Sequence, residues 1–167
     1  MPTPERPTYA VEPLVPTRDI EAVAAIEAVA FPHPWSKAML LAAIAPSRRG
    51  HAYVARSCDG VMAYCIGQLV VDELHIHTFA VHPGVRRGGL GRRLLRTVLH
   101  EAESVGVTSS TLEVRRSNIA AQRLYEGAGF TRSGVRPGYY PGPVEDALVY
   151  WRRSAMAEPS RRPDRGL

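Results

Sequence analysis

The feature that most constrains the fold is a glycine- and arginine-rich turn between an apolar run and an amphipathic helix. The turn reads His82-Pro-Gly-Val-Arg-Arg-Gly-Gly-Leu-Gly-Arg-Arg. A series of apolar residues starts in this turn and recurs at the spacing of one helix face. The series consists of Leu90, Leu94, Leu95, Val98, Leu99 and Ala102. Gly106 then suits the position after a helix end. The segment predicts a strand, a tight turn and a long helix.

The turn has the properties of an anion site. Gly88, Gly89 and Gly91 let the backbone approach a ligand closely because no Cβ intervenes. A helix start also offers unpaired N–H groups and the positive end of the helix dipole. With five arginines between Arg86 and Arg96, the segment predicts a pyrophosphate site. On this stretch alone, a glycine-rich turn with a solvated basic helix start remains the alternative.

Two familiar phosphate motifs are excluded. A P-loop needs Gly-Lys-Ser/Thr, whereas Gly89 is followed by Leu90 and Gly91. A dinucleotide fingerprint needs a small residue three positions after Gly91, where the chain has Leu94. The pattern that remains is Arg86-x-x-Gly89-x-Gly91.

The rest of the chain alternates strand and helix patterns, which predicts an α/β (mixed α+β) domain with one mixed sheet and helices on both faces. Thr17 is the expected N-cap of the first helix, and Ser36 that of the second. The expected strands lie at about 9–15, 51–56, 61–71, 73–81, 108–114, 130–135 and 146–151, and the expected helices at about 18–31, 36–44, 90–105 and 118–128. A loop is expected at 138–142.

Length and composition suit one globular domain. The 167 residues and the 45% hydrophobic content allow a core without metal or disulfides. We expect a disordered lead over 1–7, a folded domain over 8–153 and a flexible basic tail over 154–167; the segment from Arg152 onward carries +3 of the net charge of +5. No signal peptide or membrane-spanning run is visible, so the expected location is cytoplasmic, with Cys58 and Cys65 reduced.

The chain resembles the GNAT N-acetyltransferase superfamily and, more narrowly, the bacterial RimI family. The resemblance covers about residues 9 to 153. It rests on the turn described above and on Phe31-Pro32, Trp35-Ser36, Phe79-Ala-Val81, Leu112-Glu-Val-Arg115, Ser117-Asn118, Leu124-Tyr-Glu126, Gly129-Phe130 and Tyr139-Tyr-Pro141. It implies a GNAT fold, with one mixed, mostly antiparallel, seven-stranded sheet.

The resemblance implies acetyl-CoA as co-substrate and no metal. The residues that it assigns to the cofactor are Phe79, Ala80, Val81, Arg86, Arg87, Gly88, Gly89, Leu90, Gly91, Arg92 and Asn118. Backbone amides near Val81 would hold the pantetheine arm like an added strand and polarise the thioester carbonyl. Asn118 also suits a helix N-cap, and both roles can hold at once.

Two side chains are the catalytic candidates. Glu113 would act as the base, and its alternative is a structural ion pair with Arg115, two residues along the same strand face. Tyr125 would give a proton to the departing thiolate, and its alternative is a core tyrosine on the apolar face of its helix. Direct attack on the thioester needs no covalent intermediate, so neither cysteine is expected to act as a nucleophile.

Three aromatic residues are the candidates for the acceptor groove. Trp35, Tyr139 and Tyr140 could line it, or each could instead cover an edge of the core. His75 and His77 share a strand face but have no further ligand to complete a metal site. The segment His75-Ile-His-Thr78 departs from the family, which has a more apolar or Asn-containing strand there, and this affects the expected acceptor groove.

Three functions follow from these observations. The first is acetylation of the amino-terminal alanine of a small-subunit ribosomal protein, which the RimI resemblance implies. The second keeps acetyl-CoA but uses a lysine side chain or a small amine as acceptor. The third is a basic nucleic-acid-binding module, which the lack of interleaved aromatic residues disfavours. No membrane partner is expected, and a monomer is favoured although no sequence feature fixes the oligomeric state.

Overall fold

The computed structural model describes residues 7–155. The predictions of a disordered lead and a flexible basic tail lie almost wholly outside these residues. The elements in chain order are β1 (Ala10–Pro13), α1 (Pro16–Ala30), α2 (Lys37–Ala43), η1 (Pro46–Arg48), β2 (Gly50–Ser57), β3 (Gly60–Val70), β4 (Glu73–Val81), η2 (Pro83–Val85), α3 (Leu90–Ser104), β5 (Ser109–Arg115), α4 (Ile119–Gly127), β6 (Thr131–Tyr140) and β7 (Glu145–Arg153).

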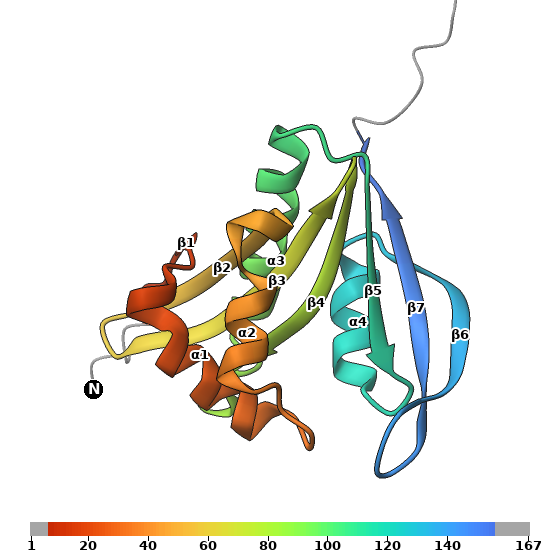
Figure 1. The fold of residues 1–167 in the computed structure, drawn as a ribbon, viewed down its shortest axis with the longest axis horizontal. Helices are drawn as coiled ribbons and strands as arrows, with labels where there is room; N and C mark the ends of the chain where they lie inside the picture. Colours follow the sequence, from red (N-terminus) through yellow and green to blue (C-terminus); the bar gives the residue numbers. More distant parts are fainter. Residues whose placement is uncertain (1–6, 156–167) are drawn as a thin grey trace, which may run out of the picture.

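The described strands form one sheet in the order β1-β2-β3-β4-β5-β7-β6. Every neighbouring pair is antiparallel except β4 and β5, which run parallel. Helices α1 and α2 cover one face, and α3 and α4 cover the other (Figure 1). This arrangement confirms the predicted mixed, mostly antiparallel, seven-stranded sheet.

Two hydrophobic cores lie on the two faces of the sheet. The core under α3 contains its whole predicted apolar stripe, in which Leu94, Leu95 and Val98 are fully buried. The core under α1 and α2 is built around Val23 and Leu40. The helical spacing of the apolar residues therefore sets which face of each helix meets the sheet.

The predicted N-cap of α1 at Thr17 is wrong. The helix begins at Pro16, whose missing N–H suits a first helical position. The cap residue is Val15, whose own N–H donates to Asp19 Oδ2 at 2.8 Å. Ser36, in contrast, caps α2 as predicted, since its hydroxyl accepts the Met39 N–H at 3.2 Å.

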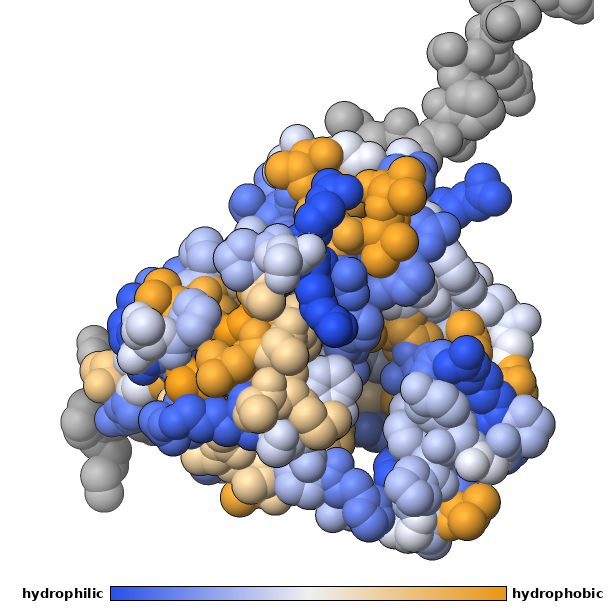
Figure 2. All heavy atoms as spheres, viewed as in Figure 1, coloured by the Kyte–Doolittle hydropathy of each residue, from blue (hydrophilic) through white to orange (hydrophobic). Residues whose placement is uncertain are grey.

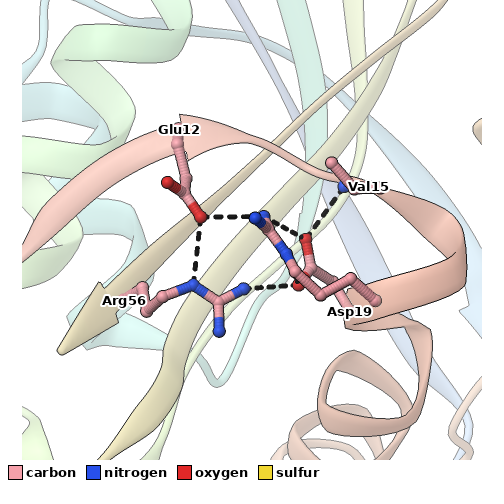
Figure 3. Close-up of polar contacts among 5 residues, drawn as sticks. Glu12, Val15, Asp19 and Arg56 are labelled. Atoms are coloured by element: carbon pink, nitrogen blue, oxygen red, sulfur yellow. Dashed lines mark hydrogen bonds and ion pairs between the residues drawn. The ribbon is translucent and has the colours of Figure 1, made fainter. Parts of the chain in front are cut away.

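The carboxylate of Asp19 is fully buried in a charged network that joins β1, α1 and β2 (Figure 3). It pairs with Arg18 Nε at 2.7 Å and with Arg56 Nη2, while Glu12 pairs with both arginines. Burial alone would raise the pKa of Asp19, but Arg18, the Val15 amide and Arg56 hold that pKa below its usual value. The network ties the start of α1 to β1 and β2.

The predicted loop at 138–142 is also partly wrong. Tyr139 and Tyr140 belong to β6, and Tyr140 pairs with Glu145 of β7. The register shifts between Arg136 and Tyr140, where Gly138 has φ of +60°, so the strand continues through an irregular segment. Two tyrosines are thereby held on a strand instead of a free loop.

Strand β4 contains a bulge at His77. Its register with β3 runs Ile66↔Thr78 and then Gly67↔Ile76, which leaves His77 without an opposite residue. Ile76 packs in the α3 core, whereas Thr78 bonds to α1 on the other face. Because of the extra residue, the side chains of β4 after the bulge face the opposite side of the sheet from the one that strict alternation would give.

Strands β4 and β5 separate just beyond this bulge. Their parallel pairing ends at Ile76↔Leu112, and the two strands then diverge (Figure 1). The opening splits the sheet into a β1–β4 half and a β5–β7 half. Seen from the α1–α2 face, the surface is hollowed between these halves (Figure 2).

Candidate active site

The free edge of β4 forms one wall of the opening. The His82 N–H donates to Met62 O of β3 at 2.7 Å. In an antiparallel pair the hydrogen-bonded positions alternate, so the N–H and C=O of Val81 and Phe79 point away from β3 and into the opening. By the same alternation Ala80 bonds toward β3. The predicted amides at Phe79 and Val81 are thus available to a ligand, whereas that of Ala80 is part of the sheet.

The turn after β4 is held in a defined shape. His82 Nδ1 accepts the Gly84 N–H at 3.1 Å, and Arg86 Nε donates to Val81 O at 3.0 Å. Arg87 and Gly89 both have positive φ, at 69° and 82°. A positive φ at Gly89, directly before α3, is favourable only for glycine and aims the following amides outward.

The start of α3 leaves backbone donors free, as the sequence predicts. Gly89 has no side chain to cap the helix, so the first N–H groups at Leu90, Gly91 and Arg92 have no capping partner within the described residues. The Leu90 side chain is buried in the core, so only its backbone can serve a ligand. A Cβ on Gly91 would lie 3.3 Å from Val81 Cγ2, and the turn therefore packs closely against the end of β4.

Asn118 begins α4 on the other side of the opening. Its Oδ1 accepts the Ala121 N–H at 3.1 Å, so the predicted N-cap role is confirmed. The Gln122 amide donates to Arg116 O at 2.8 Å and further fixes this helix start. The Asn118 amide nitrogen is not used by the cap and remains available to a ligand.

Glu113 lies on β5 at the point where the strands part. Leu112 and Val114 face the α3 core, so Glu113 faces the α1–α2 side, as the alternation predicts. Its carboxylate is 28% exposed and pairs with Arg136 Nη1 at 2.7 Å. The alternative pair with Arg115 does not form, because Arg115 pairs with Glu145 at 3.3 Å.

Tyr125 is both a core residue and a candidate acid. Its ring lies between Phe79 and Phe130, with centroid distances of 6.2 and 5.9 Å. Among the described residues its hydroxyl has no hydrogen-bond partner, and no fully buried side-chain nitrogen or oxygen there is unpaired, so the hydroxyl oxygen reaches solvent. Burial raises the pKa of Tyr125, which keeps its proton in place at neutral pH.

Trp35 lies on the α1–α2 side of the opening, close to the bulge in β4. Its ring centroid is 6.3 Å from that of His77. Its backbone N–H donates to Glu27 Oε1 at 2.9 Å. The other oxygen of Glu27 accepts from Thr78 Oγ1 at 3.0 Å and from the Tyr64 hydroxyl. One buried carboxylate therefore ties the loop that carries Trp35 to the residue next to His77.

Tyr139 and Tyr140 pack edge to face at 5.1 Å. Tyr139 is half exposed, and the guanidinium of Arg136 lies 5.1 Å from its ring centroid. Burial and the nearby Glu113 raise the pKa of Tyr139 above its usual value. The Arg115 guanidinium stacks on Tyr140 at 4.3 Å. Tyr139 thus lies near Glu113 at the opening, whereas Tyr140 packs against Tyr139 and the Arg115 guanidinium.

Sequence reasoning missed Glu27, Arg136 and the role of the bulge at His77. A signal for Glu27 exists, because it lies four residues after Val23 on the apolar face of α1. A charged residue at such a position points to a buried polar network. No comparable signal exists for Arg136, which reaches Glu113 from 23 residues along the chain.

A family model described as the Acetyltransferase (GNAT) family matches residues 20–130. The ribosomal protein bS18-alanine N-acetyltransferase of Salmonella typhimurium is 37% identical over 141 residues, which cover 81% of this chain and 92% of that enzyme. The enzyme of the same name from Escherichia coli K12 is 39% identical over 138 residues, covering 80% and 90%.

Solved structures agree with these sequence relatives. The crystal structure of the ribosomal-protein-S18-alanine N-acetyltransferase from Escherichia coli superposes with a TM-score of 0.85 at 34% identity, covering 93% of this chain and 99% of that one. Ard1 from Thermoplasma volcanium gives 0.79 at 27% identity, covering 87% and 97%. Within residues 7–155, no cluster of three metal-binding side chains is present and no helix could span a membrane.

Proposed function

Because this chain belongs to the acetyltransferase (GNAT) family and is therefore an acetyl-CoA-dependent N-acetyltransferase, we propose that it acetylates the α-amine at the amino terminus of a protein. The acceptor that fits best is the amino-terminal alanine of a small-subunit ribosomal protein, modified in the cytoplasm. The observation that carries this proposal is the 37–39% identity, over about four fifths of the chain, with enzymes named for that acceptor.

The residues of the opening fit the cofactor. The unpaired amides at Leu90, Gly91 and Arg92 suit a diphosphate, and the space beside Gly89, where a Cβ would meet no atom within 4 Å, leaves room for it. The exposed Arg86 and Arg87 add positive charge there. The free edge of β4 suits the amide-containing pantetheine arm, which would pair with Phe79 and Val81. Asn118 faces the same arm from α4.

The amide of Val81 would stabilise the developing negative charge. Acetyl transfer to an amine passes through a tetrahedral state in which the thioester oxygen carries that charge. A fixed backbone N–H aimed at this oxygen gains strength as the charge grows, and it needs no reorganisation. Arg86 donates to the Val81 carbonyl at 3.0 Å and so fixes the peptide group that follows Val81.

Glu113 would remove a proton from the incoming amine, directly or through one water. An α-amine has a pKa near ~8 and a lysine near ~10.4, so the α-amine is far more often neutral at pH 7. The difference corresponds to roughly 3.3 kcal/mol in favour of a chain terminus. A base of ordinary strength is sufficient for such an acceptor.

Tyr125 would complete the transfer. As the bond between carbon and sulfur breaks, the departing thiolate needs a proton. Burial raises the pKa of Tyr125 and keeps its hydroxyl protonated, and its ring packs against Phe79, whose backbone lies on the free edge of β4. Trp35 and Tyr139 would contact the first residues of the acceptor from the α1–α2 side.

We expect acetyl transfer to be selective for a free amino terminus. The test is a panel of peptides that vary residue 1 among Ala, Ser and Glu and carry one internal lysine, incubated with acetyl-CoA and read by intact mass and fragmentation. A matched peptide with a blocked terminus is the control. The expected product carries one acetyl group on residue 1, fastest with Ala. Acetylation confined to lysine or to small amines would overturn the proposal.

A further inference from the structure

The bulge in β4 brings a second titratable side chain to the acceptor side of the opening. His77 is the bulged residue itself, and part of its surface is exposed while its neighbours cover the rest. It lies on the α1–α2 side, because its ring is 6.3 Å from that of Trp35 in the α1–α2 loop. The catalytic and acceptor-binding roles proposed above involve Trp35 and Glu113 but give no role to His77.

The register places His77 next to Glu113. The last paired residues of the two parallel strands are Ile76 and Leu112, and His77 and Glu113 follow them directly where the pairing ends. Ile76 and Leu112 both pack in the α3 core, and the residues that follow them face the opposite side. His77 and Glu113 therefore lie on the same side where the strands part, and the Glu113 charge acts on the imidazole.

Glu113 is constrained as a base by its own partner. Arg136 Nη1 pairs with its carboxylate at 2.7 Å and so occupies one of the two carboxylate oxygens. A neutral imidazole suits proton transfer near pH 7 better. The groups that face His77 are His75 on its own strand, Arg48 of η1 and Glu113 of β5. Desolvation, His75 and Arg48 lower the pKa of His77, so it is neutral at pH 7.

We propose that His77 is a second proton acceptor beside Glu113: while Arg136 engages Glu113, the imidazole takes the proton of the acceptor ammonium group and Glu113 stabilises the resulting imidazolium. This inference rests on the proposed function. One proton of the ammonium passes to the imidazole, directly or through a water, and leaves a neutral amine. The amine nitrogen then forms its bond to the thioester carbon while the bond to sulfur breaks. The sulfur takes a proton from Tyr125, the new amide returns one to Tyr125, and the imidazolium releases its proton to solvent.

The position of Trp35 also favours this role of His77. Its ring is tilted 35° from that of His77, and an aromatic face attracts a cation that forms above it. The Glu27 carboxylate bonds both the Trp35 amide and the Thr78 hydroxyl, so it fixes the two segments that set the position of His77. Glu27 is thus a positioning residue.

The test is the pH dependence of kcat/KM with an Ala-starting peptide for the wild type, His77→Gln and His77→Phe. We expect a loss of roughly ten-fold or more at pH 7 in both variants, because general-base catalysis typically contributes about 10²-fold and Glu113 remains. The loss should shrink toward pH 9, where the amine is already neutral. His100→Gln, an exposed histidine on α3, is the matched control and should behave as wild type.

The outcomes separate this inference from the proposed function. Equal losses at every pH would show that His77 only shapes the groove, and an unchanged profile would show no role at all; either result overturns the inference. Unaltered acetyl-CoA affinity in calorimetry shows that the variants are folded. If the wild type acetylates no amino terminus, the proposed function itself fails.

Discussion

Replacing Glu113 by Gln is expected to lower kcat about 100-fold while leaving acetyl-CoA binding unchanged. The substitution keeps the size and a hydrogen-bond acceptor for Arg136 but removes the group that takes or stabilises the proton. The estimate is the lower end of the usual range for a general base, since His77 would still accept a proton. Steady-state kinetics with an Ala-starting peptide measure kcat, and calorimetry measures cofactor affinity.

A matched control for this variant is Glu73→Gln. Glu73 lies on the neighbouring strand and pairs with His75 at 2.7 Å, away from the point where β4 and β5 part. Its replacement should leave kcat within about two-fold, since a partly exposed ion pair contributes little. A parallel fall in turnover and in cofactor affinity for Glu113→Gln would show that Glu113 is structural.

Replacing Glu27 by Ala is expected to destabilise the fold by about 3–5 kcal/mol. The carboxylate is 2% exposed and accepts from the Trp35 amide, the Tyr64 hydroxyl and the Thr78 hydroxyl. Its loss would leave the Trp35 N–H without its partner, and the buried Tyr64 and Thr78 hydroxyls, 3.1 Å apart, could then bond only each other. Urea unfolding followed by circular dichroism gives the free energy of unfolding.

Two further variants make the Glu27 prediction specific. Glu27→Gln keeps one acceptor and adds a donor that either hydroxyl can accept, so we expect a smaller loss of about 1 kcal/mol. Glu21→Ala, on the exposed side of the same helix, removes only a surface pair with Lys37 and should cost about 0–1 kcal/mol. A loss below about 1 kcal/mol for Glu27→Ala would contradict the role of this network.

The parts of the fold that the sequence predicts are those fixed by local rules. The stripe from Leu90 to Ala102 predicts α3 because helical spacing alone selects its buried face. The β-rich runs at 51–56 and 61–71 predict β2 and β3, and Asn118 predicts the start of α4. In each case the deciding residues are neighbours in the chain.

The parts that were not predicted depend on distant partners. Thr17 loses the cap position because Asp19 bonds Val15, and Asp19 is itself oriented by Arg56 from another strand. Tyr140 continues β6 because it pairs with Glu145, although its surroundings are rich in glycine and proline. The composition of a turn does not reveal a pairing of this kind.

The candidate site likewise combines features that local rules predict with features that depend on distant partners. The glycine turn can be predicted from the sequence because glycines, arginines and a helix start follow one another directly in the chain. The partner of Glu113 was not predicted, since Arg115 is near in sequence but Arg136 is near in space. The bulge at His77 depends on the register of β3 against β4, which the alternation of apolar residues does not specify.

The most direct test is a calorimetric titration of the folded wild-type protein with acetyl-CoA. If the turn at 82–91 and the free edge of β4 hold this molecule, one equivalent binds with a dissociation constant of about 10 µM or tighter, within the usual range for enzyme substrates. Gly89→Val should weaken binding at least about ten-fold, because φ of +82° at that position is unfavourable for a branched residue. No uptake by the wild type at millimolar acetyl-CoA would contradict the account.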